Sequence, residues 1–256
     1  MYLEAVIVCV NYSDFLAHTL PHNKHHFDRL IVVTDKSDTK TKDLCEFHHV
    51  ECVQTDAFYS EGAPFNKAKG INFGLNRLSR KGWVLHLDAD MYLPPLTRRI
   101  LENIELNPQH IYGIDRLMCP TYEAWINFLE RPKPIHEGWI YIHSTIFPMG
   151  VRIAEYMSKG YEPIGFFQLW HPETSGVYWY PEEHGAADRT DVLFAKKWPR
   201  GLRSLIPEVI GIHLDSEDLQ SMGKNWNGRK TAPFEYPVRY ESKGFLGRIL
   251  DLLRGR

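Results

Sequence analysis

The chain has 256 residues, of which 43% are hydrophobic and 24% are charged, and its formal net charge is −2. These are ordinary values for a globular protein, and the length suffices for one large α/β domain or two small ones. The near-neutral charge excludes a protein that coats nucleic acid through a general basic field, although a nucleic-acid substrate bound in a local groove stays open.

The cysteines and the N-terminal residues predict the compartment. Cys9, Cys45, Cys52 and Cys119 form no Cys-x-x-Cys pair, and Cys9 falls within a predicted buried strand. This usage favours a reducing, cytoplasmic interior. The residues from Leu3 onward read directly as a strand without a basic leader, so we expect neither a signal peptide nor a membrane anchor.

The first half of the chain alternates predicted strands and helices. Continuous apolar runs predict strands that are buried on both faces, as in a parallel sheet. Strands are expected at 5–10, 30–34, 50–53 and 83–87, with helices between them at about 13–20, 39–47 and 65–78, and Pro21 should end the first helix. Strands and helices that alternate at this spacing imply right-handed crossovers and a Rossmann-like, mostly parallel sheet.

The stretch from Trp83 to Pro95 places two carboxylates at the end of a strand. Because strand side chains alternate, Asp88 and Asp90 can project to one side as the strand ends, and Pro94 and Pro95 force a turn. Open α/β sheets bind ligands at the carboxyl ends of their strands. Paired carboxylates there suit Mg²⁺ or Mn²⁺ with substrate phosphates; the alternative is that they only cap a helix or lie solvated in a turn.

Several familiar motifs are missing. No Gly-x-Gly-x-x-Gly follows the first predicted strand, and no Gly-x-x-x-x-Gly-Lys-Ser/Thr occurs, so neither a standard dehydrogenase nor a P-loop enzyme is expected. The adjacent histidine pairs at 25–26 and 48–49 cannot converge on one metal ion, and we expect both pairs at the surface.

The amino-acid composition changes in the second half of the chain. After a predicted helix that ends near residue 103 and a predicted strand at 110–114, aromatic residues become dense. We interpret this region as a second, aromatic-rich subregion of short strands and loops on the same sheet, whose rings are mostly core, some of them available to stack on a sugar or base. These residues are Trp125, Trp139, Tyr141, Tyr161, Trp170, Tyr178, Trp179 and Tyr180.

Three later segments carry polar or basic residues of interest. Residues 186–195 predict a helix with Asp188 and Asp191 in its first turn, where carboxylates stabilise the helix without any catalytic role. His213 lies in an apolar strand at 209–214, and a lone histidine on a strand is more often structural than a ligand. Residues 245–254 predict a basic amphipathic helix that docks on the domain, dimerises or touches a membrane surface, with docking favoured.

Four stretches in this order resemble the A-type-fold glycosyltransferases, close to the large family-two group of nucleotide-sugar enzymes. The resemblance covers roughly residues 3–230, and the stretches at 165–170 and 223–229 also look like those of small bacterial and phage-type members. Residues 6–12 resemble the family's first strand and nucleotide-binding turn, and residues 65–75 resemble the helix before its metal motif. Residues 87–90 match the Asp-x-Asp motif, and residues 209–214 resemble the strand with a late metal-binding histidine.

The resemblance implies a metal site and a catalytic base. Asp90 would bind the cation that bridges the donor diphosphate, Asp88 would assist the metal and hold the ribose or sugar side, and His213 would complete the metal shell. Asp188 falls where the family carries an acidic pair whose carboxylate is the base of inverting members. Ala187 stands here instead of the preceding acid, which leaves the role of Asp188 less well supported than that of the Asp-x-Asp motif.

The resemblance also implies where the donor binds. Val10, Asn11 and Tyr12 would line the base pocket, Asp35 would contact the nucleoside, and Lys67 would lie near the donor. A cation on the departing diphosphate stabilises its developing negative charge, and the acceptor hydroxyl needs a base within hydrogen-bond reach.

We therefore predict a metal-dependent glycosyltransferase that uses Mn²⁺ or Mg²⁺ and moves a sugar, with inversion, from a nucleoside-diphosphate sugar, of which a UDP-sugar is favoured. The acceptor stays open among a glycan, a lipid-linked sugar, a protein and a modified base in DNA. The alternatives are a nucleotidyltransferase, which usually needs a Gly-rich loop that residues 10–13 lack, and an inactive nucleotide- or carbohydrate-binding module.

The predicted organisation is a single glycosyltransferase A-type domain at 1–236, with a nucleotide-binding half at 1–95 and an acceptor half at 96–236. An amphipathic tail at 237–256 follows the domain and is the element that would give a cytoplasmic protein peripheral membrane contact.

Overall fold

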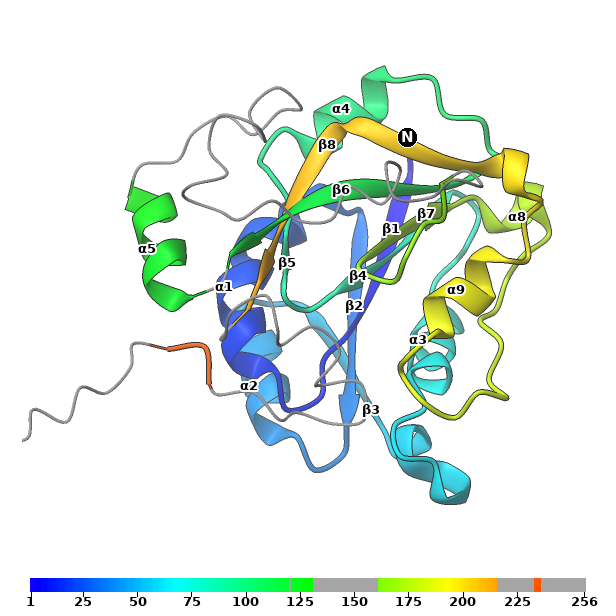
Figure 1. The fold of residues 1–256 in the computed structure, drawn as a ribbon. Helices are drawn as coiled ribbons and strands as arrows, with labels where there is room; N and C mark the ends of the chain where they lie inside the picture. Colours follow the sequence, from blue (N-terminus) through cyan, green and yellow to red (C-terminus); the bar gives the residue numbers. More distant parts are fainter. Residues whose placement is uncertain (120, 131–160, 216–232, 236–256) are drawn as a thin grey trace, which may run out of the picture.

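The computed structural model of the chain describes residues 1–119, 121–130, 161–215 and 233–235. In these residues an eight-stranded sheet runs through the molecule in the order β3-β2-β1-β4-β7-β6-β8-β5 (Figure 1). Its first four strands pair in parallel, which confirms the alternation of strands and helices that the apolar runs predict. These strands are β1 (Leu3–Val8), β2 (Arg29–Asp35), β3 (Glu51–Thr55) and β4 (Trp83–Asp88).

The other half of the sheet mixes strand directions. The short strand β7 (Phe167–Trp170) lies antiparallel between β4 and β6 (Ile111–Cys119). Strand β6 pairs in parallel with β8 (Arg203–Leu214), and β8 pairs antiparallel with β5 (Met91–Tyr92). Strands from both halves of the sequence therefore belong to one sheet, and the mostly parallel α/β class that we expected is confirmed.

Helices cover both faces of the sheet. Helices α1 (Ser13–Asn23), α2 (Thr39–Phe47) and α4 (Thr97–Asn103) pack their apolar residues with one face of β1 and β2. Helices α3 (Lys67–Leu75) and α9 (Thr190–Ala195) pack against the other face (Figure 1). Helix α5 (Tyr122–Glu130) contributes to a third apolar cluster at the β6–β8 end of the sheet. The remaining helical segments are short: α8 (Pro172–Ser175) and the 3₁₀ helices η1 (Lys24–His26), η2 (Ala57–Gly62) and η3 (Arg200–Leu202).

The structure corrects two local expectations in the first helical region. Helix α1 continues through Pro21 to Asn23, because the proline lies in the last turn and the N–H of Lys24 still donates to the Leu20 carbonyl. His26, which we expected at the surface, is only 4% exposed because η1 turns it inward. Burial lowers the pKa of His26 to about 4, so the buried imidazole is neutral at physiological pH.

The aromatic-rich region is mostly core where it is described. Trp125, Tyr161, Trp170 and Tyr180 are buried, whereas the neighbouring rings at 178–179 are more than a third exposed. Trp139, Tyr141, the basic loop at 223–229 and the tail at 237–256 lie outside the described residues. No helix in the described part of the chain is long and apolar enough to cross a membrane.

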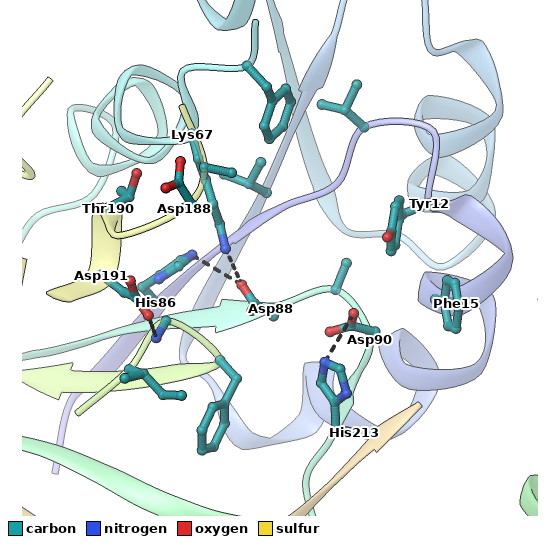
Figure 2. Close-up of a pocket in the computed structure, with 18 of the residues that line it drawn as sticks. Tyr12, Phe15, Lys67, His86, Asp88, Asp90, Asp188, Thr190, Asp191 and His213 are labelled. Carbon is teal, nitrogen blue, oxygen red and sulfur yellow. Dashed lines mark hydrogen bonds and ion pairs between the residues drawn. The ribbon is translucent and has the colours of Figure 1, made fainter. Parts of the chain in front are cut away.

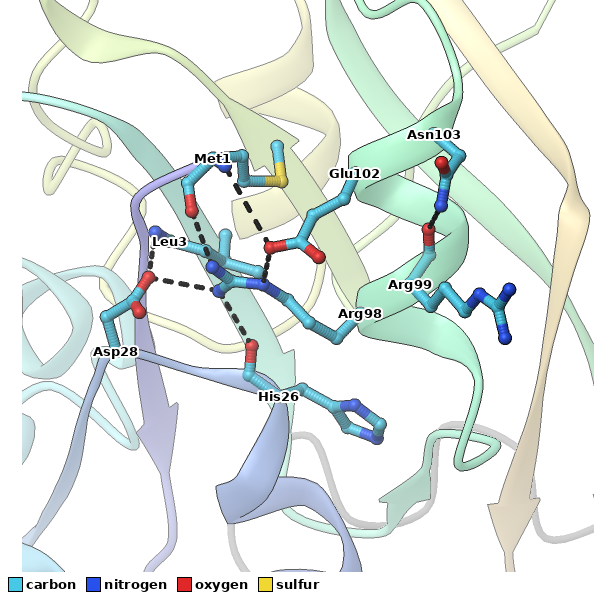
Figure 3. Close-up of polar contacts among 8 residues, drawn as sticks. All are labelled: Met1, Leu3, His26, Asp28, Arg98, Arg99, Glu102 and Asn103. Carbon is cyan, nitrogen blue, oxygen red and sulfur yellow. Dashed lines mark hydrogen bonds and ion pairs between the residues drawn. The ribbon is translucent and has the colours of Figure 1, made fainter.

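Arg98 of α4 joins the helix layer to the edge of the sheet (Figure 3). Its guanidinium donates to the carbonyl oxygens of His26, at 3.1 Å, and Met1, and to the carboxylates of Asp28, at 3.0 Å, and Glu102, at 2.7 Å. Asp28 in turn accepts the N–H at the start of β1 at 2.7 Å. One side chain thus fixes α4, η1 and the beginnings of β1 and β2 relative to one another.

We predict that Arg98→Ala lowers the free energy of unfolding by about 1–2 kcal/mol, because it removes several charge-assisted bonds from a side chain that is only 21% exposed. Arg99→Ala is the matched control, since Arg99 is exposed and its side chain points away from this network (Figure 3). Urea denaturation measures both. Equal stability of the two variants would show that the Arg98 contacts contribute nothing measurable.

Candidate active site

A cavity of about 370 Å³ lies where β1 and β4 end side by side. The two strands pair in parallel with Val8 opposite Asp88, so the segment that follows β1 and the Asp-x-Asp segment that follows β4 meet at one edge of the sheet. The segments at 164–166 and 187–191 and the end of β8 at 213–215 complete the wall. The volume is in the range of cavities that hold a small-molecule ligand.

Asp90 and His213 form a pair on the wall of the cavity (Figure 2). Strand β5 places them together, because it pairs with β8 in a register that sets Met91 opposite His213. Asp90 Oδ2 lies 3.3 Å from His213 Nε2, and each side chain is 17% exposed. Burial alone would raise the pKa of Asp90, but His213, Lys67 and Arg116 together lower it below its usual value. The carboxylate is therefore ionised.

Asp88 is paired with a lysine instead (Figure 2). Lys67 is the first residue of α3, whose N-terminus is capped by the Asn66 side chain, and its Nζ lies 2.5 Å from Asp88 Oδ1. Burial opposes the charge on Lys67, but the carboxylates of Asp88, Asp191 and Asp90 outweigh it and raise the pKa of the lysine. The two carboxylates of the motif thus face the same cavity with different partners, one a cation and the other an imidazole.

His86 lies below this pair on the same face of β4. Its Nε2 is 3.8 Å from Asp88 Oδ1, and the side chain is 1% exposed. Burial, and then the charge of Lys67, lower the pKa of His86 well below its usual value, so the ring is neutral. The alternation of strand side chains led us to predict Asp88 and Asp90 alone as site residues. The same alternation could have identified His86, which lies two residues before Asp88 and therefore on the same face of β4.

The residues at 10–12, which we predicted to form a base pocket, line the cavity. Tyr12 stacks on Phe15 with ring centroids 5.2 Å apart, and Phe15 stacks on Phe234 at 4.8 Å. The N–H of Phe234 donates to Asp14 at 2.6 Å, so a segment from the far end of the described chain supports this wall. Asn11 adopts a positive φ of 57°, a conformation that asparagine tolerates better than most residues.

Asp35 does not line the cavity. One of its carboxylate oxygens accepts the N–H and the hydroxyl of Ser37, at 2.9 and 2.6 Å. The acid that supports the turn at Asn11 is Asp38, whose carboxylate accepts the N–H of Asn11 at 2.7 Å and the hydroxyl of Thr41 at 2.7 Å. Our assignment of Asp35 to the nucleoside stays a prediction, and the structure adds Asp38 as the residue that holds the turn.

Asp188 and Asp191 approach the cavity from the segment around the start of α9 (Figure 2). Helix α9 begins at Thr190, so Asp188 precedes the helix and does not lie in its first turn as we expected. Asp188 Oδ1 is 3.1 Å from His184 Nε2. Asp191 accepts the N–H of Gly165 at 2.6 Å and that of Val192 at 2.8 Å, so its carboxylate is fixed in orientation.

The residues fit a divalent cation at Asp90 and His213. Asp90 Oδ2 and His213 Nε2 face each other 3.3 Å apart on the cavity wall, close enough for a carboxylate oxygen and an imidazole nitrogen to bind one cation. The other carboxylate oxygen of Asp90, Oδ1, has no hydrogen-bond partner among the described residues. Among the residues that the structure describes, no group of three or more Asp, Glu, His or Cys side chains is arranged so that it could hold a metal ion. Asp88, the third predicted ligand, is held by Lys67.

Comparison with known proteins identifies the fold. The sequence matches no protein-family model and no curated protein. The structure is similar to mannosyl-3-phosphoglycerate synthase from Rubrobacter xylanophilus, with a TM-score of 0.50, 15% identity, and coverage of 88% of this chain and 70% of that one. Glucosyl-3-phosphoglycerate synthase from Mycobacterium tuberculosis, in complex with Mn²⁺ and UDP-glucose, gives a TM-score of 0.45 at 12% identity and covers 87% of this chain and 74% of that one.

At identities of 15% and 12% the likeness concerns the fold alone. The match to the Rubrobacter structure covers most of this chain. The predicted fold, a Rossmann-like, mostly parallel sheet of the glycosyltransferase A type, is confirmed.

We predict that Gly165→Ala destabilises the protein by about 1–3 kcal/mol and displaces Asp191, because an added Cβ would lie 2.9 Å from the Asp191 Cβ. Gly201→Ala is the control, since a Cβ there meets nothing within 4 Å. Thermal unfolding compares the two, and a crystal structure of the alanine variant locates Asp191. An unmoved carboxylate in a fully stable variant would show that this close approach is not required.

Proposed function

We propose that the protein is a metal-dependent glycosyltransferase that moves a sugar from a nucleoside-diphosphate sugar to an acceptor hydroxyl. The observation that carries this proposal is the pair Asp90–His213, with unpartnered polar atoms, beside the pair Asp88–Lys67 at the ends of β4 and β8. Both pairs face one cavity that also receives the turn after β1. A glycosyltransferase A-type fold places its donor at this edge of the sheet, as the resemblance of the sequence implies.

Asp90 and His213 would hold Mn²⁺ or Mg²⁺. Asp88 would join them through its second oxygen, or would stay with Lys67 and bind the ribose or sugar side of the donor. When bound, the cation supplies electrostatic stabilisation of the departing diphosphate. Lys67 remains a cation beside Asp88 and adds a second positive charge at the same end of the cavity.

The donor would place its base against the wall at residues 10–12. Tyr12 presents an aromatic side chain at the cavity and is backed by Phe15, an arrangement that suits stacking on a planar base. We propose UDP as the nucleotide on the resemblance of the sequence. The acceptor stays open, and the identity of the Rubrobacter neighbour adds 3-phosphoglycerate to the compounds worth testing.

Asp188 is our proposed catalytic base. Its carboxylate lines the cavity, is 30% exposed and makes its one described contact with His184, which leaves lone pairs available for an acceptor hydroxyl. Asp191 is the rival, since it also lines the cavity and is better oriented. Both of its oxygens already accept backbone N–H groups, which favours a positioning role for Asp191.

Two other functions compete with this proposal. A nucleotidyltransferase would release pyrophosphate from a nucleoside triphosphate, and residues 10–13 contain no glycine for the phosphate loop that such enzymes usually have. An inactive binding module would bind a nucleotide sugar without consuming it. Screening UDP- and GDP-sugars for nucleoside-diphosphate release with Mn²⁺ separates all three, because only a glycosyltransferase releases UDP or GDP.

We predict that Asp90→Asn lowers Mn²⁺ affinity by about 10- to 100-fold and abolishes Mn²⁺-dependent UDP release, because the neutral amide is a much poorer cation ligand. Calorimetry measures the first effect and a coupled assay the second. Asp43→Asn, an exposed position in α2, is the control for loss of one carboxylate. Wild-type affinity for Mn²⁺ in a folded Asp90→Asn variant would remove the metal assignment.

We predict that Asp188→Asn lowers turnover by about 10²- to 10⁴-fold with little change in donor affinity, because a general base acts in the chemical step. Asp191→Asn should lower turnover less. Steady-state kinetics with an identified acceptor compares the two variants, and NMR of the product should show an inverted anomeric centre. A larger loss in Asp191→Asn would transfer the role of the base to that residue.

A further inference from the structure

Arg116 is a positively charged residue that lines the cavity. It was not predicted from the sequence to be a site residue, and the function proposed above gives it no role. It lies on β6, opposite Gly211 of β8. Its guanidinium carbon stands 4.4 Å above the ring centroid of Phe166, which fixes the plane of the group. Its neighbours on the strand, Asp115 and Leu117, are each 1% exposed.

Arg116 is surrounded by carboxylates but is paired with none of them in the described chain. Asp90, Asp88, Asp191 and Asp215 are close enough to support its charge electrostatically. The first two are engaged by other groups, since Asp88 pairs with Lys67 and Asp90 with His213. The Nε of Arg116 is buried and has no hydrogen-bond partner among the residues that the structure describes.

An arginine that only neutralised these acids would be expected to form a direct ion pair, because a guanidinium presents five donors in a fork that matches a carboxylate. Arg116 keeps that fork uncommitted at the cavity, beside the acid that would hold the cation. Guanidinium groups bind phosphate oxygens in the same bidentate way as carboxylates. The lining carboxylates also outnumber the lining basic side chains, which are Lys67, Arg116 and Arg189. Lys67 is already engaged by Asp88 and Arg189 is exposed to solvent, so Arg116 is the partly buried cation that is left for an anionic diphosphate.

We propose that Arg116 binds the diphosphate of the donor and stabilises the nucleoside diphosphate as it departs. This inference rests on the function proposed above. It adds a residue from β6, in the predicted acceptor half of the sequence, to the donor site. The resemblance of the sequence assigned that site to residues of other segments only. The guanidinium would contact the phosphate oxygens beside Asp90, whose charge acts on it.

The test compares a ligand that carries the diphosphate with one that lacks it. UDP affinity of the full chain in Mn²⁺ is measured by calorimetry, and uridine affinity by ligand-observed NMR. Arg116→Gln should weaken UDP binding by about 10- to 100-fold and leave uridine binding within about twofold. Arg116→Lys should fall between wild type and Arg116→Gln, because it keeps the charge and loses the planar fork. Arg99→Gln, which removes one exposed positive charge outside the cavity, should match wild type.

The outcomes separate this inference from the function on which it rests. Wild-type UDP affinity in Arg116→Gln would overturn the role of Arg116 and leave the glycosyltransferase proposal standing. Equal losses for UDP and uridine, with a lowered melting temperature in both Arg116 variants, would also overturn it by showing a structural role. Unchanged UDP affinity with loss of binding to an anionic acceptor such as 3-phosphoglycerate would move the guanidinium to the acceptor. Failure of the wild-type chain to bind UDP with Mn²⁺ would instead reject the proposed function.

Discussion

The parallel pairing of β1 with β4 is the constraint on which the rest of the site depends. Because Val8 stands opposite Asp88, the two strands end together, and the turns that follow them share one edge of the sheet. A shift of one residue in this register would turn Asp88 toward the opposite face, where the apolar partners of α1 lie. Helix α3 then delivers Lys67 to Asp88, and β5 delivers Asp90 to His213.

The buried acids of this protein fall into two groups that differ in how completely they are satisfied. Glu4, which is fully buried in β1, accepts the N–H and hydroxyl of Ser79 and the N–H of Arg80, so both of its oxygens are engaged. Asp38 is likewise saturated by the turn and helix that it supports. Asp90 keeps one buried oxygen without a partner in the described residues. Since burying an unsatisfied carboxylate oxygen is costly, this oxygen sets Asp90, on the cavity wall, apart from Glu4 and Asp38.

Local sequence patterns predicted the fold well because apolar runs, prolines and the Asp-x-Asp segment act over a few residues. The strands β2 and β4 and the helix at 39–47 lie within one residue of their predicted bounds, whereas β1 begins and ends two residues before the apolar run at 5–10. The site was harder to predict because it is assembled across the chain. The inward orientation of Asp191 depends on Gly165, and the exposure of Arg116 to the cavity depends on the register of β6 with β8. Asp35 and Asp38 could not be told apart from sequence, since both follow the same strand and only the turn at Asn11 distinguishes them.

The contact between Phe234 and α1 has a consequence for how the molecule acquires its site. The bond from Phe234 N–H to Asp14 joins residues 220 positions apart, and the ring beside it supports the wall at Tyr12. Closing so long a loop is entropically costly and becomes favourable only after the intervening sheet has formed. The wall at Tyr12 is therefore among the last parts of the fold to gain its final packing during synthesis. A nascent chain that has emerged only as far as residue 215 would already contain every acid that lines the cavity, but not the Phe234 ring that supports the wall at Tyr12.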